Sequence, residues 1–526
     1  MTEPARDSRA ERAADRQRPP GASRGPWGHA VVIGAGFTGL LTARVLAGRF
    51  DRVTVLERDE LPSGAAHRSG LPQARHPHGM LARGARIVED LFPGVRAELA
   101  AQGAPVFDFG AGFATRLPYG WAPRRPVGIE VQSFGLADLE AVLRARVRAL
   151  PGVRVRDGFV VEGLRLSADR RIAVGVTGHR RADPGQTPVR IEADLIVDAA
   201  GRRSRLPGWL AAAGLPAPRR LKVPSPLVYS SRMYELTGDQ APDWLVAFEM
   251  TLPPLVDRGG AAVTVAGTRR LISLVAPAET LPPPRDDEAL RRFAATLRSP
   301  HFAEVMARGR PVSPVYRCVV GGNDWLRYDR LRPRPDRLLV AGDAFCAFNP
   351  VYGQGLTVAA LQARLLARLL ATADGPGGLA HRFQRRAARI ALVPWLTATA
   401  ADAGWSNGLA GRPERMMRGL LDVVLRRLPD EPELYARFAR VQNMLASPAV
   451  LLRPLLTRRG RPARPGRRTR SAGPGADAAA SPDDVTVRDG ELENRVPGAR
   501  PRSGNGSDGC ARHRRTRRTR RPAREQ

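Results

Sequence analysis

The chain has 526 residues, and its 84 Lys and Arg residues against 51 Asp and Glu residues give a formal net charge of +33 at pH 7. This length is enough for two to three domains with a large core. The first 28 residues hold no apolar run of signal-peptide length, and no uninterrupted apolar stretch of 18 residues occurs, so we expect a cytoplasmic protein. Cys318, Cys346 and Cys510 are odd in number and widely spaced, which excludes a disulfide framework and a cysteine metal site.

The positive charge does not follow a pattern typical of nucleic-acid recognition. Lys222 is the only lysine, the Arg residues are scattered, and no aromatic residues are interleaved with them for stacking on bases. From Arg458 onward, 19 Arg against 8 acidic residues lie among Pro, Gly, Ser and Ala, which accounts for +11 of the net charge. We expect no specific nucleic-acid partner, and we expect residues 1–28 and 458–526 to be disordered.

The first strong motif lies between His29 and Asp59. An apolar run leads into Gly34-Ala35-Gly36-Phe37-Thr38-Gly39 and then into a helix. The first glycine permits a tight turn, the second lets a pyrophosphate approach the backbone, and the third lets helix and strand pack closely. A second apolar strand ends at a glutamate about twenty residues further on, where a carboxylate can bind ribose hydroxyls. The motif predicts dinucleotide binding by Gly34, Gly36, Phe37, Thr38, Gly39, Glu57 and Arg58.

Residues 62–79 are rich in Gly, Pro and His and are predicted to form a loop before a helix at Met80 to Leu91. Arg75, His76 and His78 lie in this loop. They have no carboxylate or cysteine at metal-ligand spacing, and we expect no metal site in the chain. Two interpretations remain: they line a pocket beside the cofactor, or the loop is simply solvated. The first interpretation makes these three residues the catalytic candidates.

The following segments alternate between strand and helix patterns. Residues 104–131 contain short apolar pieces broken by Gly and Pro, as in a small antiparallel sheet, and residues 135–150 carry apolar side chains at helical spacing. Strands are predicted at 153–161 and 189–198. The second of them ends in Asp198-Ala-Ala-Gly201-Arg-Arg-Ser204, where glycine permits a close backbone approach. This turn either belongs to the dinucleotide site or is only structural.

Residues 225–277 alternate in the manner of strands, and a helix follows at 287–297. We therefore expect a second domain dominated by a sheet. Such a sheet can cover a flavin ring and form the wall of a substrate pocket, or it can simply form a large core.

The second strong motif runs from Arg337 to Leu370. A buried strand leads to Gly342-Asp343, and a Pro-x-x-Gly-x-Gly turn then opens a long helix. The aspartate is suited to bind a ribityl hydroxyl. The helix start supplies N–H groups and a positive dipole end, which would stabilise negative charge on the pyrimidine edge of a reduced flavin. The residues assigned to this part of the site are Asp343, Pro350, Gly353, Gln354 and Gly355.

Residues 379–456 contain helices with apolar stripes, among them one formed by Met416, Met417, Leu420, Leu421, Val424 and Leu425. A basic amphipathic segment of this kind can touch a membrane and collect a lipophilic substrate. A stripe at this spacing is more typical of a core helix, so membrane contact is the less favoured interpretation. Trp395 and Asp402 are expected to belong to the packing of these helices.

In their order along the chain, the glycine motif, the turn after Asp198 and the Gly342-Asp343 motif resemble the para-hydroxybenzoate hydroxylase-type FAD-dependent monooxygenases. The resemblance covers about Ala30 to Leu456. The chain is most similar to an actinobacterial branch that holds the polyether-type polyene epoxidases, relatives of squalene epoxidase. The segments that carry this closer likeness are residues 73–79, 198–210 and 348–356.

One departure from that family concerns the flavin. Where such proteins often read Ser-Arg-x-x-Leu-Glu, this chain has Gly135-Leu136-Ala-Asp-Leu-Glu140. A flavin-contacting arginine is therefore missing, and Gln132 is its expected substitute.

The resemblance implies an α/β (α+β) fold. A glutathione-reductase-like Rossmann domain that binds FAD would be interleaved with an antiparallel-sheet substrate domain and followed by C-terminal helices and a disordered tail. The expected FAD-binding domain comprises residues 29–220, with a small-sheet insertion at about 104–131, and residues 331–375. The substrate domain would span residues 221–330 and the C-terminal helices residues 376–457.

The resemblance also implies an FAD-dependent monooxygenase, an epoxidase or a hydroxylase, that acts on a small lipophilic substrate of secondary metabolism through a flavin hydroperoxide. No second glycine motif is visible, so NAD(P)H must bind transiently as the electron donor, or an external flavin reductase must supply electrons. Epoxidation of an alkene needs no protein base. Hydroxylation of a phenol benefits from one, and the sequence identifies none.

Three other functions stay open. Flavin-dependent halogenases resemble this fold, but they carry a Trp-x-Trp-x-Ile-Pro segment and an active-site lysine. Here the Trp residues are isolated, and Lys222 lies in a predicted loop. The second alternative is a reductase that saturates isoprenoid double bonds, and the third is a non-catalytic flavin-binding protein. NADPH-dependent oxygen consumption would separate these alternatives from a monooxygenase.

Overall fold

A computed structural model describes residues 27–66, 68, 70, 72–237, 241–279, 284–319, 321–405 and 412–452. All of them belong to one compact unit, Met1–Gly460, and the second unit, Arg461–Gln526, lies outside the described residues. The disorder expected for residues 1–28 and 458–526 therefore also falls outside them, except that Trp27 and Gly28 already belong to the first strand.

A parallel sheet of five strands forms the centre of one half of this unit. Its strands lie in the order β20-β11-β1-β2-β7, and every neighbouring pair is parallel. Residues 30–33, 53–56, 195–198 and 338–340, in four of the strands, are buried and mostly Val, Ile and Leu, because both faces of the sheet are covered, whereas the edge strand β7 alternates valine with arginine and is partly exposed. The strands are β1 (Trp27–Ile33), β2 (Phe50–Leu56), β7 (Val153–Arg156), β11 (Leu195–Asp198) and β20 (Leu338–Val340).

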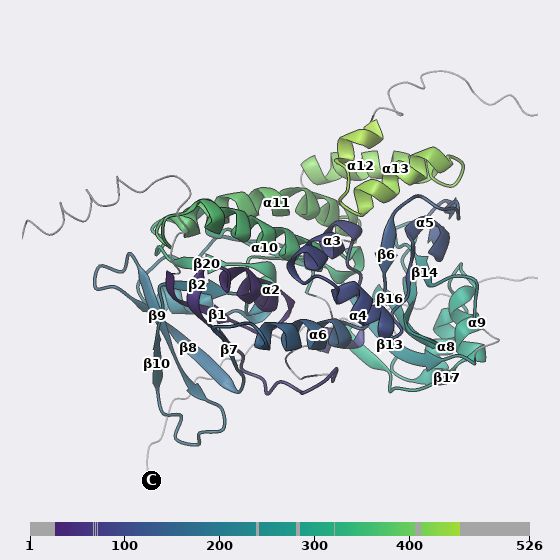
Figure 1. Cartoon of the computed structure of the whole chain (residues 1–526). Coiled ribbons are helices and arrows are strands. Elements are labelled where there is room, and N and C mark those ends of the chain that lie inside the picture. The colour runs from purple at the N-terminus through teal and green to yellow at the C-terminus, as the bar shows by residue number, and fades with distance from the viewer. Residues whose placement is uncertain are drawn as a thin grey trace, which may run out of the picture. The chain divides into compact units, whose positions relative to one another are not determined.

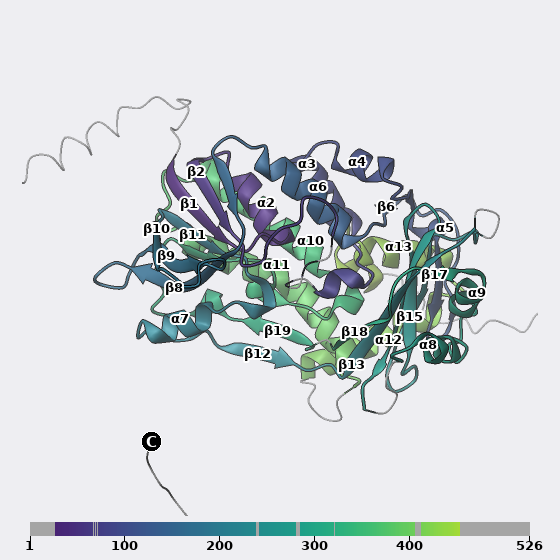
Figure 2. The same ribbon diagram turned by 90° about the horizontal axis from the view of Figure 1, so that it is seen from below.

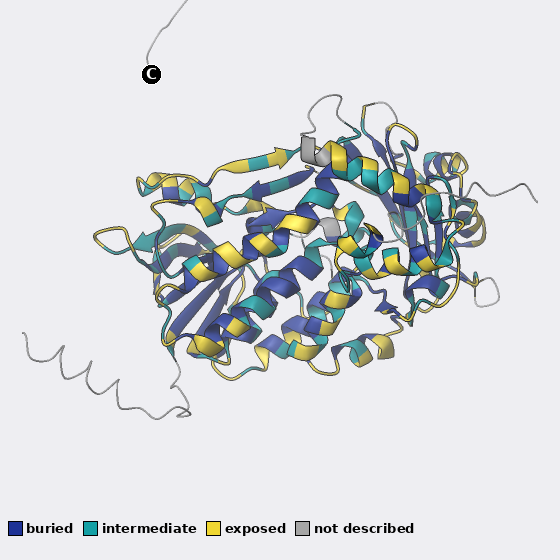
Figure 3. Cartoon of the chain, turned by 90° about the horizontal axis from the view of Figure 1, so that it is seen from above, coloured by how far each residue is buried: buried dark blue, intermediate teal, exposed yellow. Residues whose placement is uncertain are grey.

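Helices cover one face of this sheet, with α10 (Gly355–Thr372) packed between α2 (Phe37–Leu46), α3 (Ala82–Leu91) and α11 (Leu379–Asp402). Figure 1 shows α10 and α11 side by side, and Figure 3 shows that α11 is buried on one side and exposed on the other. Within the described part of the chain, α10 is the one helix apolar and long enough to span a membrane, but 56% of it is buried inside the protein. Its apolar composition is therefore explained by its place in the protein core.

The remaining elements of this half flank the parallel sheet. A three-stranded sheet contains β8 (Phe159–Leu166), β9 (Ala173–Arg180) and β10 (Val189–Glu192), and a second one contains β12 (Arg220–Val223), β19 (Asn323–Leu326) and β21 (Cys346–Ala347). The helices α4 (Val95–Ala101), α6 (Leu136–Arg148) and α7 (Leu206–Ala212) complete it.

An eight-stranded sheet forms the other half, at the opposite end from the parallel sheet in Figures 1 and 2. The segment after residue 225 supplies β13 (Leu227–Glu235), β14 (Val246–Glu249), β15 (Gly259–Ala266) and β16 (Arg269–Pro277). The strands β17 (Arg310–Pro311) and β18 (Tyr316–Val319) both pair with β13. On one face lie α8 (Asp287–Ala294) and α9 (His301–Arg308), whose apolar residues join the core of this sheet.

The segment 104–131 is divided between two sheets. Its strands β4 (Phe113–Leu117) and β5 (Gly120–Trp121) extend the eight-stranded sheet, because β4 pairs with β14 in parallel. Only β3 (Val106–Asp108) and β6 (Glu130–Gln132) form a separate two-stranded sheet, with the single turn α5 (Phe109–Gly112) between β3 and β4.

The C-terminal helices α12 (Arg412–Arg427) and α13 (Pro432–Gln442) pack against this segment. Of the apolar stripe on α12, Val424 and Leu425 are buried, whereas Met416 is 75% exposed. The whole arrangement confirms the predicted mixed fold, a Rossmann-type parallel sheet interleaved with an antiparallel-sheet domain.

Candidate functional site

The first glycine motif forms a turn that depends on missing side chains. Gly34 has φ +100°, and a Cβ atom there would lie 2.6 Å from the carbonyl oxygen of Ala199. A Cβ on Gly39 would overlap the carbonyl oxygen of Gly34. Helix α2 begins after Gly36, which provides no side-chain cap, and among the described residues the N–H groups of Thr38 and Gly39 have no hydrogen-bond partner and remain available to an anion. The turn therefore has the shape and the donors that a pyrophosphate requires.

Glu57 ends β2 beside this turn. One oxygen of its carboxylate accepts a hydrogen bond of 2.8 Å from the N–H of Ala35, and the other accepts one of 3.1 Å from the N–H of Asp59. The neighbouring Arg58 has a side chain that is 47% exposed and pairs with Asp59 at 3.8 Å. Of these two predicted cofactor-binding residues, Glu57, predicted to bind the ribose, thus lies in the turn, and Arg58 faces solvent.

Two residues that sequence reasoning missed lie at the start of α2. Glu140 of α6 accepts a hydrogen bond of 3.2 Å from the N–H of Phe37. The Arg68 guanidinium lies 3.2 to 3.4 Å from carboxylate oxygens of Glu57, Asp59 and Glu140, and these four side chains are at most 9% exposed. Burial raises the pKa of Glu140, an effect that Arg68 opposes.

The sequence held only one signal for this cluster. Glu140 ends the segment in which the chain departs from the family pattern, while Arg68 is one arginine among many in a loop. A Cβ on Gly36 would lie 3.6 Å from the Glu140 carboxylate and 3.7 Å from the Arg68 guanidinium, so both groups border the expected pyrophosphate position.

The second motif meets the first, although the two are far apart in sequence. A Cβ on Gly342, which has φ +62°, would overlap the side chain of Thr38 in α2. Asp343 follows and keeps 40% of its side chain exposed, with the Nε atom of Arg202 3.6 Å from its carboxylate. Gly355, the first residue of α10, lies against that carboxylate, since a Cβ there would be 3.8 Å from Oδ1.

The charge at Asp343 is balanced by its surroundings. Partial burial raises the pKa of this carboxyl group, and the Arg202 guanidinium opposes the shift. Gly353, with φ +62°, and Gln354 complete the turn before α10, and the Gln354 amide donates to Thr397 at 3.2 Å. An acceptor for a ribityl hydroxyl and an open helix start therefore lie together, and the residues present fit FAD.

The turn after Asp198 also lies at this junction. The carboxylate of Asp198 accepts hydrogen bonds from the N–H of Ala200 at 3.0 Å and from the Ser204 hydroxyl. Burial raises the pKa of this carboxyl group to about 6. Because Ala199 packs against Gly34, this turn supports the first glycine motif from the neighbouring strand.

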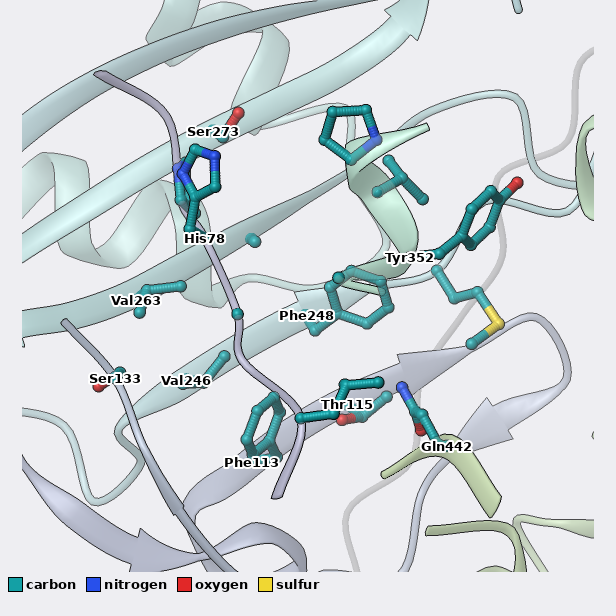
Figure 4. A pocket seen from close by; sticks show the side chains of 18 of the residues that line it. His78, Phe113, Thr115, Ser133, Val246, Phe248, Val263, Ser273, Tyr352 and Gln442 are labelled. Carbon is teal, nitrogen blue, oxygen red and sulfur yellow. The ribbon is translucent and has the colours of Figure 1, made fainter. Parts of the chain in front are cut away.

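A cavity of about 220 Å³ lies between the second motif and the eight-stranded sheet. Pro350, Tyr352 and Gly353 line it on the side of α10, and Phe438 and Gln442 of α13 line it on another side. Figure 4 shows the rings of Phe113 and Phe248 with Val246 and Val263 along its wall. Its lining is mostly aromatic and aliphatic, which suits the body of a lipophilic ligand.

The three catalytic candidates of the loop occupy different places. His76 and His78 line the cavity, whereas Arg75 is not among the described residues that line it. The Arg75 guanidinium lies over the ring of Tyr316, 4.6 Å from its centroid. Gln132 also lines the cavity, and its amide donates to the carbonyl oxygens of Arg96 at 3.0 Å and Ala104 at 3.3 Å.

Both histidines are held in place through Nδ1. The Nδ1 atom of His76 lies 2.7 Å from the Ser231 hydroxyl, and Nδ1 of His78 lies 2.8 Å from the carbonyl oxygen of His76. Burial is the largest cause that lowers both pKa values, to about 4 for His76. Both imidazoles are therefore neutral at pH 7.

A buried polar network ties α11 to the turn before α10. Asp402, the last residue of α11, accepts hydrogen bonds from Asn323 at 2.6 Å, from Asn349 at 3.1 Å and from the Tyr352 hydroxyl at 2.8 Å. Asn349 in turn accepts one of 2.9 Å from the hydroxyl of Tyr229, which lines the cavity. Burial raises the pKa of Asp402 to about 6. Sequence reasoning had assigned Asp402 only to packing.

The fold and this site define an FAD-dependent oxidoreductase. The family of FAD-dependent oxidoreductases described as DAO matches residues 29–119, which contain the first glycine motif. Protein Rv3254 of Mycobacterium tuberculosis is 32% identical over 451 residues, which cover 80% of this chain and 90% of that protein. The chain therefore belongs to the same family as protein Rv3254.

Solved structures share the fold at lower identity. The flavin-dependent brominase Bmp2, in a triple mutant, has a TM-score of 0.55 at 15% identity and covers 81% of this chain and 98% of its own. PqsL, a probable FAD-dependent monooxygenase from Pseudomonas aeruginosa, has a TM-score of 0.53 at 17% identity and covers 75% of this chain and 100% of its own. These likenesses confirm the flavoprotein fold.

Proposed function

We propose that the protein is an FAD-dependent monooxygenase that inserts one oxygen atom into a small lipophilic substrate of secondary metabolism. The observation that carries the proposal is the cavity beside the second motif, because it joins an apolar ligand space to the residues that fit the flavin. None of the described residues that line it is Arg or Lys, in a chain with 84 of them. The single carboxylate in the lining, Glu249, is paired with Arg298 at 3.1 Å. A neutral, apolar molecule suits such a space best.

The proposed reaction consumes one O₂, one NAD(P)H and one proton. One oxygen atom enters the substrate, the other leaves as water, and NAD(P)H is oxidised to NAD(P)⁺. FAD, when bound, supplies the activation of oxygen. The chain's own contribution would be to hold the flavin in the cradle of Gly34 and Asp343, to position the substrate against the sheet and to exclude water from the cavity.

The source of electrons follows from the number of dinucleotide cradles. The described chain has one glycine cradle, so NAD(P)H would bind transiently, or an external flavin reductase would supply the electrons. We further expect the protein to act in the cytoplasm. The closer likeness to polyene epoxidases in residues 73–79 and 348–356 supports oxygen transfer to an alkene or a ring.

A halogenase is the second candidate, because the brominase Bmp2 shares the fold. The distinguishing feature would be a lysine beside the substrate. The only lysine of the chain, Lys222, lies exposed on β12 and does not line the cavity. The halogenase therefore has less support than the monooxygenase. A flavin-dependent reductase or a non-catalytic flavin-binding protein would share the cradle but would not insert oxygen.

One experiment tests these functions together. The purified protein is incubated with FAD, NADPH, oxygen, bromide and the metabolites of its neighbouring biosynthetic genes, and the products are analysed by mass spectrometry. A product that gains one oxygen atom, with matching NADPH and oxygen consumption, is the expected result. A brominated product would establish the halogenase, a product with two added hydrogens the reductase, and a protein that binds FAD without any turnover the non-catalytic role.

A further inference from the structure

The His78 imidazole has a defined tautomer. Its Nδ1 atom lies 2.8 Å from the carbonyl oxygen of His76, and a carbonyl oxygen can only accept a hydrogen bond. Nδ1 must therefore carry a proton. Burial lowers the pKa of this ring, so at pH 7 it holds no second proton. The Nε2 atom is consequently a lone-pair acceptor.

The segment that carries His78 lies beside the turn before α10, because a Cβ on Gly353 would be 3.8 Å from the carbonyl oxygen of Gly79, the next residue. His78 lines the cavity together with Pro350, Tyr352 and Gly353 of the turn before α10. Among the described residues no hydrogen bond reaches Nε2. In Figure 4 the His78 ring and the Ser273 hydroxyl lie toward one end of the view, and Phe113, Thr115 and Gln442 toward the other.

The neighbouring His76 does not have a fixed tautomer. Its Nδ1 lies 2.7 Å from the Ser231 hydroxyl, which lies 2.7 Å from the Ser273 hydroxyl. Hydroxyl groups can donate in either direction along such a row, so His76 can be a donor or an acceptor. His78 is thus the histidine whose role the surrounding backbone determines.

We propose that Nε2 of His78 accepts the proton of a phenolic hydroxyl on the substrate, so that the protein hydroxylates a lipophilic phenol. This inference rests on the proposed monooxygenase function and decides between its two reactions, because an alkene epoxidase has no use for such a base. The apolar lining would hold the ring system of the phenol while its hydroxyl group faces His78.

The proton transfer balances as follows. The phenol O–H bond breaks, its electron pair stays on the oxygen, and the proton forms an N–H bond at Nε2. The resulting imidazolium, which burial alone disfavours, is stabilised by the negative charge of the phenolate beside it. The phenolate oxygen donates electron density to the ring carbons ortho and para to it, which promotes attack of an electrophilic oxygen there. After oxygen transfer the attacked carbon loses its proton to water. The product oxygen takes the proton back from Nε2, and His78 ends neutral.

A binding experiment tests the acceptor without any turnover. The protein loaded with FAD is titrated with 2-naphthol and with naphthalene, which has the same ring system without the hydroxyl group, and fluorescence reports binding. We expect 2-naphthol to bind about 10-fold more tightly, the effect of one well-placed hydrogen bond. His78→Phe should abolish this difference. His381→Phe, a change on α11 outside the cavity, should preserve it. Equal affinities of the unaltered protein for both compounds would overturn the inference.

The pH dependence of turnover supplies the second measurement, with 2-naphthol or any phenol found to be oxidised. With His78→Phe, kcat/KM should fall by about 10²-fold or more at pH 7 and rise with pH toward the pKa of the free phenol, about 10. FAD content should not change. A uniform loss at every pH would indicate a merely structural role and contradict the inference.

Other titratable groups do not imitate this pH profile. Burial lowers the pKa of His76 to about 4 and raises the pKa values of Tyr229, Tyr352 and Cys318, which places all of them away from neutral pH. Burial also raises the pKa of Tyr435 to about 12. The remaining titratable or charged groups around the cavity are Glu249 with its partner Arg298, Arg75 beside His76, and Asp402 behind Tyr352, whose pKa of about 6 lies below the pH range in which the activity of His78→Phe should rise.

The two proposals fail in different ways. Oxygen insertion into a vinyl-substituted ring such as 2-vinylnaphthalene, combined with equal binding of 2-naphthol and naphthalene, would retain the monooxygenase and reject the phenol. Preferential binding of 2-naphthol that depends on His78, without NADPH-dependent oxygen consumption, would retain the phenol site and reject the monooxygenase.

Discussion

Gly342 lies directly against Thr38, so closely that a Cβ atom at position 342 would overlap the threonine side chain. This contact joins the start of α2 to the segment that carries Asp343. The two motifs come from opposite ends of the folded chain, and each forms one part of the cofactor site. Neither motif forms the complete site on its own. The contact explains why both glycine turns must be correct before FAD can bind.

Gly34→Ala tests the first turn. At φ +100° an alanine is strained, and its Cβ would lie 2.6 Å from the carbonyl oxygen of Ala199. We expect a loss of about 1 to 3 kcal/mol in stability and a marked loss of bound FAD, measured by absorbance at constant protein concentration. Gly64→Ala is the matched control, because a Cβ there would meet nothing within 4 Å. Unchanged FAD occupancy in Gly34→Ala would refute the assignment of this turn.

Asp343→Ala tests the second motif. The change removes the acceptor for a ribityl hydroxyl, and FAD affinity should fall by about 1.5 to 3 kcal/mol, as for a hydrogen bond to a charged group. The dissociation constant can be measured by quenching of flavin fluorescence. Asp243→Ala, which removes a carboxylate with an 81% exposed side chain, should leave the constant unchanged. An equal effect of both variants would contradict the assigned contact.

Arg68→Ala tests the buried cluster at the start of α2. The change leaves the carboxylates of Glu57, Asp59 and Glu140 without their shared cation, so the free energy of unfolding should fall by about 3 to 5 kcal/mol. Urea unfolding gives this value. The Arg171 side chain is 85% exposed, and Arg171→Ala should cost at most about 1 kcal/mol.

A second substitution locates the coupling within this cluster. In the Arg68→Ala background, Glu140→Gln removes one of the unpaired charges and should recover part of the lost stability. Additive losses from the two substitutions would show that Arg68 and Glu140 do not interact.

The buried carboxyl group of Asp402 predicts a pH dependence. Its pKa is raised from 3.8 to about 6 in the folded protein, so the native state retains a proton that the unfolded chain releases at lower pH. The contribution of Asp402 to stability is therefore full below pH 4 and is lost as pH rises to about 6. Compared with the non-titrating variant Asp402→Asn, the wild-type protein should lose about 3 kcal/mol of relative stability across this window. A difference that is constant between pH 4 and 7 would contradict the shift.

Truncation after Arg461 tests the basic tail. The removed segment lacks apolar periodicity and cannot offset the entropy of its own ordering, so the shortened protein should fold and bind FAD as the full chain does. Soluble yield, FAD content and the thermal midpoint are the measurements. Insoluble or flavin-free protein would show that the tail contributes to the fold.

Much of the fold could be predicted because its signals are local. The glycines at 34, 36 and 39, the strand that ends at Glu57 and the Gly342-Asp343 motif each require particular residue types at short spacings. The pairing of β4 with β14 has no such signal, because strands far apart in sequence pair through backbone groups that every residue carries.

The candidate site was less accessible to sequence reasoning for the same reason. The assignment of Glu57 needs only its place at a strand end, but the Arg68 cluster and the Asp402 network need side chains from distant segments. The tautomer of His78 depends on one carbonyl oxygen two residues earlier, and the sequence gives no information on the loop conformation that brings it within 2.8 Å.

The parallel pairing of β4 with β14 has a consequence for protein engineering. The eight-stranded sheet is completed by a strand that precedes most of its other members in the chain by more than a hundred residues. A chimera that exchanges only residues 221–330 between relatives would keep the recipient's β4 against a foreign β14 and the recipient's Phe113 in a foreign cavity. Exchange of substrate preference therefore requires two separate segments of the chain to be transplanted together.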